Sequence, residues 1–456
     1  MNKKINACQV FSFYSNLNSI CKSPVLIENY KFSLFCRSCI LTLLLSCFFT
    51  LSWADDQVPV QEITNYSPRF SGYGTLGYAT DNNDNIAPIR DVSQKLDSGY
   101  LTGDSWKLDS RLGFQVDYRL SPDLELVVQM MLRDQVVNNL NSKVELAYLG
   151  LTPKTDWDLR IGRFGYDIFL LSDHRNLGYS YYWIRPPEVY YSWLPIFSVD
   201  GIDAIYKFQS GDAYWRIKGQ LGQSQPSVAI DHGAYQADVK GLFTFNISRE
   251  SGPWRAKIGF SRFKVVNEVA TLIPLHSELD RITAAGTQGV SAESAQLRKE
   301  IGFKRASMNY LSMGLAYDDG LWQAQAELGM TDTNKDFISA SDAAYISVGR
   351  RIGKYTPFVI ISALRPNTHL YQPINNWGAD ANWQSEAIHI VNSTRMDQKS
   401  LSLGLRWDIN QQSAVKLQWT TTQIEEYGYG LWWRPIPYNG QDHRVDMLST
   451  SLDFIF

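Results

Sequence analysis

Charged side chains at alternate positions are the first candidates for chemistry in this chain. Between Trp106 and Arg119 the even positions are mostly apolar or aromatic, and nearly all odd positions are polar or charged. Such alternation gives a β-strand two chemically different faces. A charged face beside water influences which ions and polar solutes gather there. If the same parity holds in the other alternating segments, this face is mainly basic, and its candidate members are Lys107, Asp109, Arg111, Arg133, Arg160, Arg216, Lys218, Arg255, Lys257 and Arg406.

The sequence lacks the residue patterns of common enzymes and metal sites. The 6 histidines all fall in long polar connections, and no pair has the helical spacing of a zinc site. There is no Gly-x-Ser-x-Gly elbow and no phosphate-binding loop. Two acidic clusters, at 81–85 and 332–336, lack the Gly and the later Glu of a calcium loop, so solvated turns are the simpler interpretation. We therefore expect no catalysis, no cofactor and no metal.

The cysteines mark off an N-terminal segment. All 5 lie within residues 1–54, so the body can hold neither a disulfide nor a thiol nucleophile. Residues 40–51 form a short apolar run that follows basic residues and precedes Ser52-Trp53-Ala54. This order is typical of a secretory signal, and the run is too short to span a bilayer. We expect a signal peptide over 1–54, cleaved after Ala54, and a short periplasmic segment over 55–69. Lipoprotein attachment at Cys47 would leave an apolar stretch on the mature chain, which argues against it.

Long alternating segments recur through the rest of the chain. Many exceed the about 5 to 6 residues of a usual globular strand and approach the about 9 to 11 that a tilted strand needs to cross a membrane. Short connections with turn residues alternate with long polar ones. The sequence predicts seven short and eight long connections joining 16 strands. No basic run indicates nucleic-acid binding.

An even number of long strands, with one set of loops longer than the other, predicts a transmembrane antiparallel β-barrel over 70–456. In hydrocarbon every backbone polar group must be paired, so a spanning sheet has to close. The alternatives are a secreted β-sandwich or a β-solenoid. The body shows no fixed repeat and no linker that would divide it into domains, which argues against both.

With its signal segment, cysteine-free body, 16 predicted strands and terminal Phe456, the chain resembles the outer-membrane porins of Gram-negative bacteria. The resemblance implies an outer-membrane location, contact with membrane lipid and lipopolysaccharide, and a homotrimer. It also implies that Phe454 and Phe456 form the signal read by the barrel-insertion machinery.

The third long connection, near 164–197, is too apolar and aromatic for a simple solvated loop. In 16-stranded porins the loop between strands five and six folds into the barrel and narrows it. By that resemblance, an infolded third loop would present Asp167, Asp173, Arg175, Arg185 and Glu188 to the basic wall. The short acidic motif of enterobacterial porins is missing from it. The alternative is that its aromatic residues cap the barrel outside or meet another subunit.

The resemblance favours passive diffusion of small hydrophilic solutes and ions through a water-filled channel. A substrate-selective channel is the nearest alternative, and a sugar-selective version would use Tyr179, Tyr181, Tyr182 and Trp183 as stacking surfaces. A closed barrel that acts as an adhesin or receptor through its long fifth and seventh loops is another alternative.

Overall fold

The structure is a computed structural model that describes residues 67–83, 85–95, 103–230, 233–433 and 442–456. The predicted signal peptide and most of the predicted periplasmic segment lie outside the described residues, so both remain predictions.

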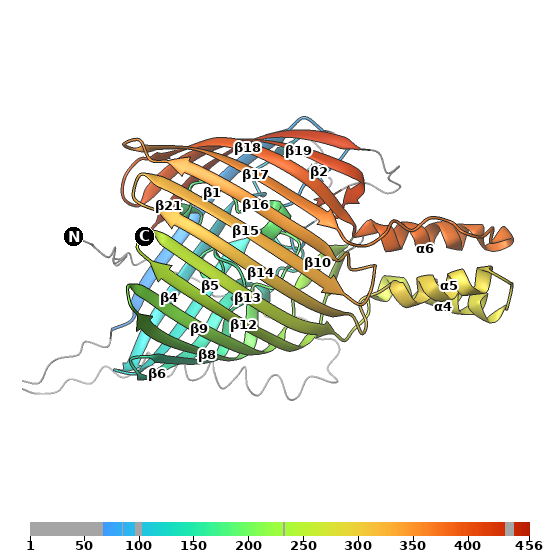
Figure 1. The fold of residues 1–456 in the computed structure, drawn as a ribbon, viewed down its shortest axis with the longest axis horizontal. Helices are drawn as coiled ribbons and strands as arrows, with labels where there is room; N and C mark the ends of the chain where they lie inside the picture. The colour runs from blue at the N-terminus through green and yellow to red at the C-terminus, as the bar shows by residue number, and fades with distance from the viewer. Residues whose placement is uncertain (1–66, 84, 96–102, 231–232, 434–441) are drawn as a thin grey trace, which may run out of the picture. The chain divides into compact units, whose positions relative to one another are not determined.

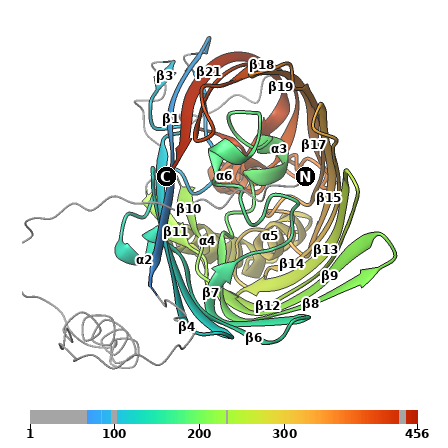
Figure 2. The same cartoon turned by 90° about the vertical axis from the view of Figure 1, so that its left-hand side faces the viewer.

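Sixteen long strands form one closed antiparallel barrel (Figures 1 and 2). Each strand pairs with its neighbours along the chain, and β1 closes the ring because it pairs with both β4 and β21. The predicted 16-strand barrel is thus confirmed. Its strands are β1 (Arg69–Asp81), β4 (Arg111–Ser121), β5 (Leu124–Arg133), β6 (Val144–Lys154), β7 (Trp157–Gly165), β8 (Ser198–Ser210), β9 (Ala213–Ser224), β12 (Val239–Ser251), β13 (Trp254–Val265), β14 (Ser307–Asp318), β15 (Trp322–Thr333), β16 (Ser341–Arg350), β17 (Tyr355–Pro366), β18 (Met396–Asp408), β19 (Ser413–Tyr429) and β21 (His443–Ile455).

Smaller elements occupy the long connections. The short strands are β2 (Ala87–Pro88), β3 (Asp104–Ser105), β10 (Ser227–Ile230), β11 (Gly233–Gln236) and β20 (Trp432–Trp433). The helices are α2 (Leu140–Lys143), α3 (Glu188–Tyr191), α4 (Ile273–Ala284), α5 (Val290–Glu300) and α6 (Ala381–Ser393), with 3-10 turns η2 (Gly178–Ser180), η3 (Ala270–Leu272) and η4 (Gly378–Asp380).

The two faces of the barrel wall follow the predicted parity. On β19, Leu417 is 49% exposed, while its neighbours Lys416 and Gln418 are buried. The outer face of the wall is apolar, as at Ile161 (60% exposed) and Leu221 (59% exposed). An apolar outer surface on a closed barrel suits a hydrocarbon environment, so the barrel is a transmembrane one. Within the described residues, no helix has the length and hydropathy needed to cross a membrane.

Exposed tryptophans mark one edge of this apolar surface. Trp157, Trp254, Trp322 and Trp407 all stand beside short turns and are partly exposed. Indole rings favour the interface between membrane and water. The short-turn end of the barrel therefore lies at one interface between membrane and water.

The second strand begins later than the sequence suggested. Residues 106–110 form a turn, in which the Ser105 hydroxyl accepts hydrogen bonds from the backbone N–H groups of Lys107 and Leu108. Strand β4 starts only at Arg111. Lys107 and Asp109 therefore belong to the first long connection and not to the strand wall, contrary to the prediction; Lys107 is exposed and Asp109 is buried.

Three helices project from the long-loop end, away from the C-terminus (Figure 1). Helices α4 and α5 come from the connection between β13 and β14, and α6 comes from that between β17 and β18. The three helices pack together, with Leu279 and Leu297 buried. The buried Glu293 of α5 accepts hydrogen bonds from Trp377 and Gln384 on the other connection. The fifth and seventh loops thus form one structured unit.

The barrel seam is packed by the last aromatic residues. Gly74 of β1 lies opposite Phe454 of β21, and Phe456 exchanges two backbone hydrogen bonds with Gly72. A Cβ at Gly74 would overlap the ring of Phe454, and one at Gly72 would overlap that of Phe456. The two glycines therefore provide the space in which the terminal rings cover the seam.

We expect Gly74→Val to lower the free energy of unfolding by about 1–3 kcal/mol, because the new side chain displaces the Phe454 ring. Urea unfolding in lipid vesicles measures the effect. Gly219→Val on β9 is the matched control, because a Cβ there meets nothing within 4 Å. Equal stability of the two variants would contradict this account of the seam.

Candidate functional site

The third loop, defined here as residues 166–197, joins β7 to β8 and packs against the inner wall of the barrel. Figure 2 shows its helix α3 inside the ring of strands. Most of its aromatic residues are almost fully buried, among them Tyr166, Phe169, Trp183 and Tyr190. A connection buried to this degree needs partners for its polar groups. Three sets of contacts with the wall supply them.

The first set joins the start of the loop to β9 and β13. Asp167 forms ion pairs with Lys218 (2.9 Å) and with Lys257. Lys218 also lies 3.3 Å from Asp203 of β8, and its side chain is only 2% exposed. Burial alone would raise the pKa of Asp167, but the two lysines hold that pKa well below its usual range. The carboxylate is therefore charged and fixed at neutral pH.

The second set joins the middle of the loop to the turn before β4 and to β21. The guanidinium of Arg185 donates to Asp109 (Nε to Oδ1 2.8 Å) and to the hydroxyl of Ser449 on β21 (2.9 Å). Within the loop, Arg185 also pairs with Glu188 at 3.2 Å. The Arg185 side chain is only 2% exposed. A bidentate pair between arginine and a carboxylate fixes direction as well as distance.

The third set uses backbone carbonyls of the loop. Lys416 of β19 donates to the carbonyl oxygens of Gly178 and Trp183, both at 2.7 Å, and pairs with Asp453 at 3.0 Å. Arg406 of β18 donates to the carbonyl oxygens of Tyr179 and Tyr181 at 2.8 and 2.9 Å. These contacts satisfy carbonyl groups that the irregular loop cannot pair internally.

Buried hydroxyl groups hold the aromatic part of the loop. Tyr182 donates to Ser347 (2.8 Å), and Tyr190 lies 2.6 Å from the hydroxyl of Ser312. Glu327 accepts from the backbone N–H of Leu170 at 2.9 Å and from Tyr191. Since Tyr181, Tyr182 and Trp183 are buried in this packing, they are not free stacking surfaces for a sugar.

Most predicted wall residues hold the third loop. Arg111 donates to the hydroxyl of Tyr181 at 2.7 Å, while Asp109, Lys218, Lys257 and Arg406 make the contacts described above. Arg133 pairs with Glu145 at 3.2 Å and lies over the Phe197 ring at 3.8 Å. Three basic residues remain half-buried on β7, β9 and β13: Arg160, Arg216 and Arg255.

Two predicted loop residues lie differently from the expectation. Arg175 does not reach across to the wall cations; it donates to the carbonyl oxygen of Ile196 (2.6 Å) and lies over Phe197 at 3.9 Å. Asp173 is exposed and borders a cavity. Sequence reasoning missed Asp453 as a partner of the wall lysine. The alternation of β21 offered a signal, because Asp453 stands between the apolar Leu452 and Phe454.

A polar cavity of about 310 Å³ lies beside the third loop. It extends to the chain end at Ile455 and Phe456. Charges of both signs border it: the cations are Arg160 and Arg175, the carboxylates are Glu145 and Asp173, and His174 lies among them. Burial, and next the positive charge of Arg255, lower the pKa of His174 to about 4. His174 is thus neutral at neutral pH.

Within the part of the chain that the structure describes, no group of three or more His, Cys, Asp or Glu residues could hold a metal ion.

Comparisons with known proteins find similarity in structure only. No family model and no curated protein matches the sequence. The chain is similar to the anion-selective porin from Comamonas acidovorans, with a TM-score of 0.48 and 11% identity over 86% of this chain and 99% of that one. It is also similar to the outer membrane channel DcaP of Acinetobacter baumannii, with a TM-score of 0.47 and 10% identity over 86% and 99%. For OmpF of Salmonella typhi the TM-score is 0.46, with 13% identity over 87% and 100%.

These similar structures are porins and channels, the class that the sequence resembles. At such low identity the likeness concerns the fold. The role of the lumen therefore has to come from this chain's own side chains.

We expect Arg185→Met to lower the free energy of unfolding by roughly 3–5 kcal/mol, because the buried Asp109 loses its cation. Urea unfolding in lipid vesicles measures this loss. Arg351→Met is the control, since its ion pair with Asp318 is exposed and contributes about 0–1 kcal/mol. If both variants lost equally little free energy of unfolding, the Arg185 pair would not hold the third loop.

We expect His174 to make stability depend on pH. Its pKa in the folded protein, about 4, lies below the ordinary 6.5, so the unfolded chain binds more protons in between. The free energy of unfolding should therefore fall as the pH drops from 6.5 to 4. His174→Gln should remove roughly 1–3 kcal/mol of that fall. Unfolding of both proteins at pH 7 and pH 4 measures the difference, and identical pH profiles would refute the role of His174.

Proposed function

We propose that this protein is an outer-membrane channel that lets small hydrophilic solutes and ions diffuse passively past the third loop. One observation carries the proposal: the loop is fixed to separate parts of the inner wall by buried charges. Asp167 binds β9 and β13, Arg185 binds Asp109 and β21, and Lys416 of β19 binds the loop's carbonyl groups. Contacts in several directions keep a narrow passage at constant width.

The half-buried cations give this passage its charge preference. Arg160 borders the polar cavity. The positive charge of Arg255 lowers the pKa of His174, which borders the same cavity. Glu145 is neutralised by Arg133. With Asp173 as the opposing carboxylate, the balance at the cavity is positive. Fixed charges of one sign in a water-filled pore favour counter-ions of the other sign. We therefore propose a preference for anions.

Location and partners follow from the resemblance and the apolar outer surface. The barrel would lie in the outer membrane of a Gram-negative bacterium, in contact with lipid and lipopolysaccharide, after export through a cleaved signal peptide. Recognition of Phe454 and Phe456 by the insertion machinery and assembly as a homotrimer are proposals on the same basis.

A closed barrel that serves as a receptor is the second candidate. The observation that favours it is the helical unit of α4, α5 and α6, which projects from the long-loop end and would suit contact with a partner (Figure 1). A closed lumen and an open one differ in a single measurable property, the conductance.

Planar-bilayer recording under a potassium chloride gradient tests the proposal. We expect discrete conductance steps and a reversal potential whose sign indicates a higher permeability for chloride than for potassium. Removing one positive charge about 8 Å from an ion path in water changes the ion's energy by about 0.5 kcal/mol, which is about twofold in relative permeability. Arg160→Gln with Arg255→Gln should therefore shift the reversal potential toward cations.

Arg119→Gln is the control, because Arg119 is exposed near the end of β4 beside a short turn. An unchanged reversal potential in the double variant would exclude Arg160 and Arg255 as selectivity residues. Silence from correctly folded wild-type protein would overturn the channel and favour the receptor.

A further inference from the structure

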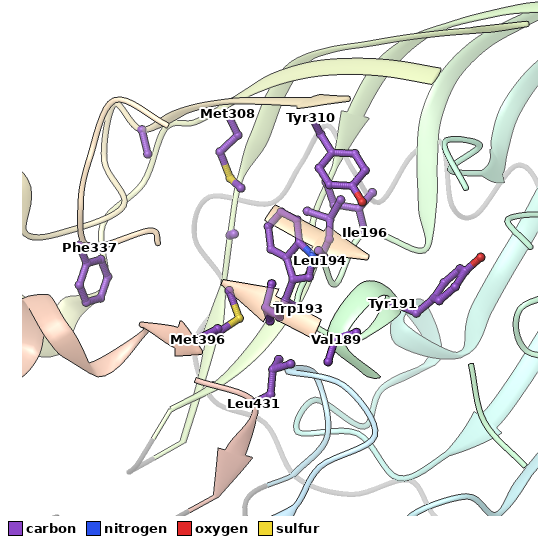
Figure 3. Close-up of a cluster of buried hydrophobic side chains, with 14 of the residues drawn as sticks. Val189, Tyr191, Trp193, Leu194, Ile196, Met308, Tyr310, Phe337, Met396 and Leu431 are labelled. Carbon is purple, nitrogen blue, oxygen red and sulfur yellow. The ribbon is translucent and has the colours of Figure 1, made fainter. Parts of the chain in front are cut away.

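A second cavity, of about 300 Å³, lies on the other side of the third loop and is apolar. Trp193, Leu194 and Ile196 of the third loop border it, together with Met308 of β14 and Met396 of β18. Figure 3 shows these five side chains within one cluster, although they come from three separate segments. We call this space the apolar cavity.

Protein interiors contain few voids larger than a water molecule. A void of about 150 Å³ lined by apolar side chains is large enough to bind benzene. The apolar cavity has about twice that volume, and about 300 Å³ is the lower end of the range for small-molecule sites. Its size therefore fits a ligand better than a packing defect.

The lining defines the chemistry of that ligand. Among the described residues that border the cavity, none is Asp, Glu, Lys or Arg, and the one histidine is the half-exposed His389 of α6. Aromatic rings are frequent, from Trp193 and Phe263 to Phe337 and Trp432. Because burying an ionised group without a partner is costly, the ligand has to be uncharged. Rings on several sides suit a flat apolar body.

One residue of the lining carries a buried hydroxyl group without a hydrogen-bond partner. Ser339 is only 3% exposed, and its Oγ has no hydrogen-bond partner among the described residues. Its position is fixed, because the carbonyl groups of the two preceding residues accept from Thr394 and Thr333. By contrast, Trp432 already donates to Gln398 at 2.7 Å. A buried hydroxyl without a partner carries a free-energy penalty that a ligand would remove.

The exposure of the lining residues indicates where a ligand would enter. Trp193, Met308 and Ser339 are buried, whereas Val228 and Ile230 of strand β10 are half-exposed. The β10–β11 hairpin thus borders the mouth of the cavity, and the third loop forms its floor.

The geometry points to a binding site for an uncharged molecule with an apolar body of about ten carbon atoms and one hydroxyl group, which bonds to Ser339. This inference goes beyond the proposed channel, because a path for hydrophilic solutes does not need an apolar cavity. Binding also does not require conduction, so either proposal can fail alone.

Calorimetric titration of 1-naphthol into the full-length protein in phosphatidylcholine nanodiscs tests the site, with empty nanodiscs as the blank. We expect saturable binding by the protein. Ser339→Ala should weaken the affinity for 1-naphthol by about three- to tenfold, which corresponds to the loss of one hydrogen bond. The affinity for naphthalene should stay within about twofold of the wild-type value.

Val228→Trp should abolish binding of both compounds, because Val228 borders the cavity on the same face of the hairpin as its buried partner Tyr235. Ala234→Trp is its control: Ala234 lies on the opposite face of the same hairpin, is exposed and does not border the cavity. Heat-dependent gel mobility checks that each variant is folded.

Absence of saturable heat, or undiminished binding by Val228→Trp, would overturn the site. Equal loss of both compounds in Ser339→Ala would overturn the hydroxyl contact. Silent bilayers with intact 1-naphthol binding would reject the channel and leave this site standing.

Discussion

Closure of the strand ladder between β1 and β21 is the constraint on which the rest of the structure depends. Nine residue pairs, from Tyr73 with Ile455 to Asp81 with Met447, join the first strand to the last. Without this pairing, two edges of backbone polar groups would face hydrocarbon, which a membrane does not tolerate. The same seam gives Phe454 and Phe456 a structural role, because their rings need the space above Gly74 and Gly72.

Closure with 16 strands creates a second problem, an interior wider than wall side chains can fill. The third loop fills part of it, and its irregular backbone has to be satisfied by the wall. Lysines and arginines reach backbone carbonyl groups and carboxylates, as Lys416 does with Gly178 and Asp453. Burying such charges is costly, so their main effect is to select one position of the loop. Many cations that parity places in the lumen are thus structural, and the proposed anion preference rests on the few that remain, Arg160 among them.

The barrel could be predicted because the sequence features that indicate it are local. Period-two alternation and turn residues give strands, faces and connections without knowledge of distant contacts. The strand start at Arg111 could not be seen in the sequence, because the Ser105 hydroxyl holds residues 106–110 in a turn without changing the alternation of polar and apolar residues. The pairing of Arg185 with Asp109 could not be predicted from the sequence either. The two residues are 76 positions apart, and they meet only because of how the third loop folds. Parity identifies an inward charge but cannot tell whether it faces water or a loop.

The third loop also explains why one lumen contains two unlike cavities. Its stretch near Asp173 and His174 borders the polar cavity, and its stretch from Trp193 to Ile196 borders the apolar one. Between them, Arg175 donates to the carbonyl group of Ile196, so the two stretches are tied to each other by one buried hydrogen bond. A shift of the loop toward either cavity would break that bond or the ion pairs at Asp167 and Arg185. The loop can therefore separate a polar compartment from an apolar one only while its charges remain paired, which links the shape of both cavities to the same few buried ions.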